Sequence, residues 1–104
     1  MSFYLVRAKP KQDLLDELAN KLKENSFLNL IPFGKAITYS LKNARLTDSG
    51  LAIWEEEDYC IPPLFEEKKS ILDFYFSDIQ VEKVKKNEGW NRISNLNNLF
   101  PHLE

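Results

Sequence analysis

The chain has little of what metal and phosphate sites usually need: one cysteine, one histidine and three glycines among 104 residues. One cysteine and one histidine cannot complete a zinc site. The segment IPFGK contains one glycine, whereas a phosphate-binding loop needs a GxxxxGK run. A lone cysteine cannot form an internal disulfide, which favours a reducing cytoplasm. The sequence therefore predicts no metal site and no cofactor.

Excess positive charge and long apolar runs are missing as well. The chain has 14 Lys and Arg residues and 16 Asp and Glu residues, which gives a net charge of -2. Nucleic-acid and anionic-membrane binding both need a basic surface. Only four consecutive apolar residues precede Arg7, too few for a signal peptide, and no apolar run reaches membrane-spanning length. We therefore expect a cytoplasmic protein with no nucleic-acid or membrane partner.

Aromatic residues, by contrast, are abundant: seven Phe, four Tyr and two Trp, within an apolar fraction of 43%. That is enough for the core of one small domain. We expect a single domain over residues 1–104, with a core at 3–85 and a docking tail at 86–104.

Apolar periodicity predicts six elements in this core. They are a strand at 3–9, a helix at 11–25, strands at 36–46 and 51–60, a helix at 63–76 and a strand at 77–86. A turn is expected at NEGW, and a short tail helix capped by Ser94 after it. Segment 36–46 fits two patterns. Ile37, Tyr39 and Leu41 alternate as in a strand, while Ile37, Leu41 and Ala44 have helical spacing. The strand is favoured because the turn cluster TDSG and the strand-like LAIW follow.

The resulting order, βαββαβ, predicts an α+β protein of ferredoxin-like fold. Four antiparallel strands would lie in the order 4-1-3-2, with two helices on one face and a short C-terminal tail helix. The opposite face needs a cover. We expect the tail or a second subunit to supply it, and hence a homodimer.

The segments FYLVRAK, LAIWEEEDYC and DIQVEKV give the chain a layout that resembles the dimeric α/β-barrel proteins. These include muconolactone-isomerase-like, small monooxygenase-like and YciI-like domains, and the resemblance covers residues 3–85. It implies paired sheets and a cavity between sheet and helices. YciI-like proteins carry a His–Asp pair, whereas the only histidine here, His102, lies in the tail.

The acidic stretch WEEEDYC is the main candidate site. Strand alternation places Glu55, Glu57 and Tyr59 on one side and Trp54 with Asp58 on the other. Three interpretations stay open: a solvated strand end, a structural ion-pair network, or a cleft with a carboxylate acting as acid, base or cation ligand. The candidate pocket or polar-site residues are Arg7, Tyr39, Trp54, Glu55, Glu57, Asp58 and Tyr59, with Tyr75 as a further lining residue.

Two functions follow from these features. The favoured one is a binding or interaction module, with the acidic strand end and the aromatic tail as its partner surface. The alternative is a small enzyme or small-ligand-binding protein with a pocket between sheet and helices. The expected partners are a second copy of the chain and a small molecule or protein.

Overall fold

The computed structural model describes residues 2–103. Its elements are β1 (Ser2–Pro10), η1 (Gln12–Leu14), α1 (Leu15–Lys23), α2 (Gly34–Lys42), β2 (Arg45–Leu46), β3 (Ala52–Asp58), α3 (Phe65–Glu67), η2 (Lys68–Leu72), α4 (Asp73–Tyr75), β4 (Phe76–Val84), α5 (Glu88–Arg92) and β5 (Asn97–Asn98). The segment η2 is a π-helical turn that joins α3 to α4. Within this described part of the chain, no helix is long and apolar enough to cross a membrane.

The strands form one antiparallel sheet in the order β4-β1-β3-β2-β5. The prediction of an α+β protein with an antiparallel sheet is confirmed. The sheet has five strands instead of four, because β5 pairs with the outer edge of β2. The ferredoxin-like arrangement is therefore not confirmed.

The strand predicted at 36–46 is wrong, because most of this segment forms helix α2. Ile37 and Leu41 lie one helical turn apart and are both fully buried in the core. That burial selects the helical pattern over the alternating one. Because this segment is helical, Lys42 does not face Glu55 across neighbouring strands, and its ammonium donates to Asn25 Oδ1 at 2.8 Å.

The tail also differs from its prediction. Helix α5 begins where the turn NEGW was expected, and residues 97–98 form β5 where a tail helix was expected. Within the tail, Ile93 and Leu96 pack against Leu5 and Val84 of the sheet. The tail thus covers part of the sheet face that was expected to be covered by the tail or by a second subunit.

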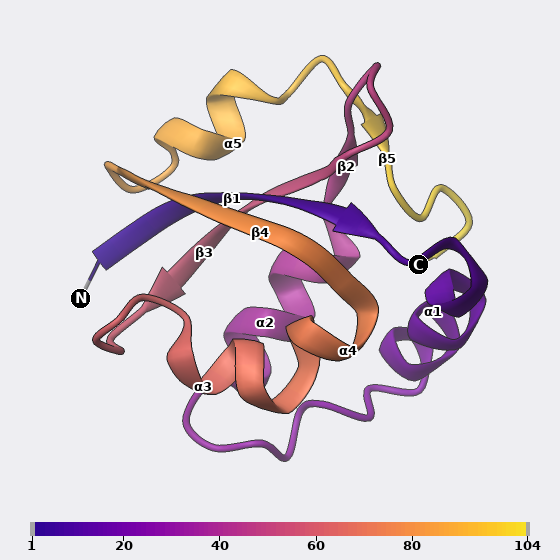
Figure 1. Ribbon diagram of the computed structural model, residues 1–104, viewed down its shortest axis with the longest axis horizontal. Coiled ribbons are helices and arrows are strands. Elements are labelled where there is room, and N and C mark those ends of the chain that lie inside the picture. Colours follow the sequence, from indigo (N-terminus) through magenta and orange to yellow (C-terminus); the bar gives the residue numbers. More distant parts are fainter. Residues whose placement is uncertain (1, 104) are drawn as a thin grey trace.

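The two faces of the sheet carry separate apolar clusters. In β1, Val6 and Ala8 point toward the larger cluster, which α1, α2 and the helical segment 65–75 complete. Leu5 points the other way, toward the cluster with Ile53 and the tail. Figure 1 shows α1 to α4 on one side of β1, β3 and β4, and α5 on the opposite side.

Candidate functional site

The candidate site lies along the open edge of β3. The outer neighbour β2 pairs only with Ala52 and Ile53, so the rest of this edge lacks a strand partner. Helix α2 packs there instead, and the Ser40 hydroxyl donates a 2.7 Å hydrogen bond to the Glu55 carbonyl. An exposed strand edge carries unpaired backbone groups, which such a contact satisfies.

A pocket of about 490 Å³ remains between α2, the end of β3, the following loop and the start of α5. This volume is within the usual range for small-molecule sites. Its aromatic lining residues are Phe3, Phe33, Tyr39, Tyr59 and Trp90. Its carboxylates are Glu55, Glu57, Asp58, Glu66 and Glu67, against a single basic residue, Lys35. The pocket is therefore acidic and aromatic.

The acidic row of β3 is mostly buried, so the interpretation as a solvated strand end is wrong. β3 continues to Asp58, and Glu55, Glu56 and Asp58 are exposed by only 4%, 0% and 4%. The ion-pair network is not found either. Every salt bridge formed within residues 2–103 involves Glu82 or Glu88 and none involves these three carboxylates. Each buried carboxylate must therefore be stabilised in another way.

Glu55 is stabilised by backbone N–H groups at the start of α5. Its carboxylate accepts hydrogen bonds from Asn87 N at 2.9 Å, Gly89 N at 2.8 Å and Trp90 N at 3.3 Å. These N–H groups have no partner within the helix, as is usual in a first turn. Glu55 therefore ties the tail to the sheet, which is a structural role.

Glu56 points to the opposite face of the strand, into the core. One of its oxygens, Oε1, accepts a 3.2 Å hydrogen bond from the Trp54 indole, and the other, Oε2, has no partner among the described residues. Burial, together with the nearby Glu67 carboxylate, raises the pKa of Glu56 well above its ordinary value. The uncharged, protonated form of Glu56 is therefore favoured in the folded protein.

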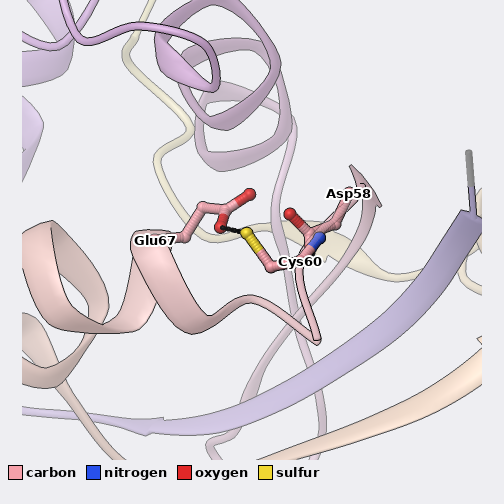
Figure 2. Close-up of side chains that lie close together, drawn as sticks. All are labelled: Asp58, Cys60 and Glu67. Carbon is pink, nitrogen blue, oxygen red and sulfur yellow. Dashed lines mark hydrogen bonds between the residues drawn. The ribbon is translucent and has the colours of Figure 1, made fainter. Parts of the chain in front are cut away.

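Asp58, Cys60 and Glu67 form a compact cluster in the pocket wall, here called the Asp–Cys–Glu cluster (Figure 2). One ligand-type atom from each lies within 4.8 Å of the other two. The Cys60 thiol donates to Glu67 Oε1 at 3.9 Å. Asp58 Oδ2 accepts from Leu64 N at 2.6 Å and from Cys60 N at 3.1 Å. These two hydrogen bonds hold the loop after β3 in a conformation that brings Glu67 close to the end of β3.

The three groups shift one another's protonation. Burial and the adjacent Asp58 raise the pKa of Glu67 to about 7. Burial raises the pKa of Asp58, but hydrogen bonds from Glu67 and the Leu64 N–H outweigh it and lower that pKa. A backbone hydrogen bond from Glu66 lowers the pKa of the Cys60 thiol, while burial and the Asp58 and Glu67 carboxylates raise it overall. Near neutral pH the cluster thus holds an ionised Asp58, a thiol and a half-protonated Glu67.

Most residues singled out from the sequence meet at this pocket. Tyr39, Glu55, Glu57, Asp58 and Tyr59 all line it. Three others lie elsewhere. Arg7 pairs with Glu82 on the surface at 3.5 Å, Trp54 is fully buried against Phe76, and the Tyr75 hydroxyl donates to Glu17 at 2.8 Å. Arg7 thus lies outside the pocket, whose charged lining consists mainly of carboxylates.

Sequence reasoning missed Cys60 and Glu67 as parts of one site. The sequence predicts Glu67 in the first turn of a helix and Cys60 as an inert buried thiol. The sequence feature that could have indicated their proximity is the short segment DYCIPPLFEE, in which two prolines favour a tight turn directly after the strand. The sequence also offered Asp58 as a cation ligand, but it did not connect Asp58 with Cys60 or Glu67.

No known protein family matches the chain, and searches of curated proteins and of solved structures found no match either.

Proposed function

We propose that this protein binds a small organic cation, such as a protonated amine on an apolar body, in the pocket beside β3. The observation that carries this proposal is the lining of the pocket: five carboxylates, five aromatic rings and one lysine around about 490 Å³. The cytoplasm is the compartment we propose for it, in keeping with its free thiol.

The charge balance supports a cationic ligand. Glu55 is occupied by the N–H groups of α5, but Glu57 and Glu66 line the pocket without a salt bridge within the described chain. Glu57 is half-buried, so its interaction with a bound ammonium would be screened less than a surface pair. An anionic ligand would meet repulsion from every side except Lys35.

The aromatic walls support the same ligand class. Tyr39 and Trp90 pack edge to face, with ring centroids 6.1 Å apart, and both line the pocket. The side chains of Tyr39 and Tyr59 are 62% and 64% exposed, so ring surface is left for a ligand. A cation over such a ring gains roughly 0.5–2 kcal/mol. The apolar body of an amine would displace water from the same rings.

A matched series of three ligands tests this proposal: phenethylamine, 2-phenylethanol and phenylacetate, which share one ring and differ in charge. Isothermal titration calorimetry at pH 7.5 and low salt should show the tightest binding for the amine, weaker binding for the alcohol and none for the acid. Trp90 fluorescence should change with the amine, because this ring lines the pocket. Equal affinity for all three, or preference for the acid, would refute cation recognition.

Two variants locate the binding. Glu57→Gln removes a pocket carboxylate with little change of shape and should weaken amine binding about tenfold, the effect of about 1.4 kcal/mol. Glu24→Gln removes an exposed carboxylate outside the pocket and should leave affinity unchanged. An equal loss in both variants would indicate only general electrostatic attraction.

An interaction module is the second candidate, supported by exposed apolar residues near the pocket. Ile31 and Ile61 are 88% and 95% exposed; Ile31 precedes Pro32 and Ile61 follows Cys60, both of which line the pocket. Self-association through these residues would also provide the expected homodimer. The uncovered part of the sheet is less suited, because it carries the charged group Arg7, Glu82 and Arg92. Light scattering on wild type and on Ile61→Ser tests this: a dimer that the variant dissociates supports the interface.

A further inference from the structure

We propose that the Asp–Cys–Glu cluster of Asp58, Cys60 and Glu67 binds a divalent transition-metal ion such as Zn²⁺. The three side chains come from the end of β3, the following turn and the first turn of the next helix. Their ligand atoms already lie within 4.8 Å of one another. The proposal rests on the proposed function only in that both use the same pocket.

A second, independent observation comes from the burial of Glu67. Glu67 is completely buried, and its Oε2 has no hydrogen-bond partner among the described residues. An unpaired buried carboxylate costs several kcal/mol when ionised. No Lys, Arg or His within residues 2–103 forms an ion pair with Glu67 or Asp58. Only a proton or a bound cation can therefore stabilise Glu67 in this position.

The ligand set selects the class of ion. Mg²⁺ and Ca²⁺ prefer oxygen ligands alone, whereas a thiolate from Cys60 favours a softer ion. Zn²⁺ binds both thiolate and carboxylate, at about 2.3 and 2.0–2.2 Å, which places tetrahedral ligands roughly 3.5 Å apart. The cluster needs to contract by at most about 1.3 Å to meet that spacing. Three protein ligands leave a fourth position open toward the pocket.

The amine site and the metal site are compatible. With a thiolate and two carboxylates the cluster carries three negative charges, and a divalent ion leaves one. Glu57 and Glu66 add two more against Lys35, so the pocket stays acidic after the metal is bound. The organic cation would then meet Glu57, Glu66 and the aromatic walls, beside the ion.

Cobalt provides a direct test on the 104-residue protein after treatment with a chelator. Co²⁺ should bind with one ion per chain and produce the near-ultraviolet absorption of a thiolate–Co²⁺ bond. Zn²⁺ should displace it. The absorption should vanish in Cys60→Ser, and Glu67→Gln should weaken Zn²⁺ binding at least about 100-fold, since even residues behind the ligands contribute 10–100-fold. His102→Ala and Glu24→Gln should bind as wild type does.

Proton release gives a second measurement that needs no variant. Zn²⁺ must displace the thiol proton of Cys60, because the thiolate is the form that binds the ion. Calorimetry at pH 7 in buffers of different ionisation heat should therefore show the release of at least about one proton per bound ion. Absence of the cobalt absorption in folded wild-type protein, or Zn²⁺ binding without proton release, would overturn the proposal.

The two proposals can fail separately. Cys60→Ser should lose the cobalt absorption while retaining phenethylamine binding, and Glu57→Gln should do the reverse. If no metal binds but the amine does, the metal proposal is wrong and the proposed function stands. If Zn²⁺ binds with the expected proton release and the amine series shows no preference, the proposed function is wrong.

Discussion

The Glu55 carboxylate lies 2.8 Å from the backbone N–H of Gly89 and holds the tail against the sheet. Glu55 is the first residue of the acidic row, yet its oxygens are occupied by N–H groups of the tail. The same row thus contains a carboxylate that stabilises the fold and another, Asp58, that forms part of the candidate metal site.

Removing this carboxylate should loosen the tail. Glu55→Ala leaves the N–H groups of Asn87, Gly89 and Trp90 without their acceptor. We expect a loss of about 2–3 kcal/mol in the free energy of unfolding, because hydrogen bonds to a buried charged group are among the stronger ones. Urea denaturation measures it. Glu57 lies two residues further along the same strand, and Glu57→Ala should lower the free energy of unfolding by less than about 1 kcal/mol. Equal losses for Glu55→Ala and Glu57→Ala would contradict the anchoring role of Glu55.

Gly89 should not tolerate a side chain. A Cβ there would lie 2.9 Å from Glu55 Oε1 and 3.1 Å from Leu5 Cδ1. Gly89→Ala should therefore destabilise the protein by about 1–3 kcal/mol, as overpacking usually does. In a Glu55→Ala background the same substitution should cost less, because the nearest atom is gone. A double-mutant cycle by urea denaturation measures this difference, and full additivity would argue against the contact.

Stability should fall as pH rises through the acidic and neutral range. The pKa of Glu67 is about 7 in the folded protein against an ordinary 4.5, so the folded state binds more protons between these values. The free energy of unfolding should drop on the order of 2 kcal/mol from pH 4.5 to pH 8. Denaturation of Glu67→Gln over the same range should show a smaller decline, with the remainder due to Glu56.

Zn²⁺ should reverse this loss if the metal proposal holds. At pH 8 an ionised Glu67 is buried without a cation, and a bound ion supplies one. At 100 times its dissociation constant, Zn²⁺ should stabilise the wild type by about 2.7 kcal/mol. Cys60→Ser should gain much less. Equal stabilisation of both proteins would place the ion elsewhere.

Ser40→Ala should weaken the contact between α2 and the open edge of β3. The hydroxyl is buried and donates to the Glu55 carbonyl at 2.7 Å. Its loss should cost about 1–2 kcal/mol in the free energy of unfolding, because a strand-edge carbonyl is left without a partner. Ser70→Ala, at an exposed helical position, is the matched control and should have an effect within about 0.5 kcal/mol.

The sequence alone determined the elements whose apolar pattern fits one structure only. β1, α1 and β3 were predicted close to their observed bounds, as were the helical segment 65–75 and β4. In α1, for example, Leu18 and Leu22 lie one turn apart and are both fully buried. A local pattern of this kind is enough, because the same periodicity fixes which side chains reach the core.

Tertiary structure decided what local pattern left open. Residues 36–46 fit both a strand and a helix, and packing of Ile37 and Leu41 in the core chose the helix. That choice left most of the β3 edge without a strand partner, and the pocket lies between this edge and α2. The proximity of Cys60 to Glu67 depends on how Asp58 folds the loop between them, through contacts that no periodicity records. Local pattern thus determined the elements, whereas long-range packing brought the site residues together.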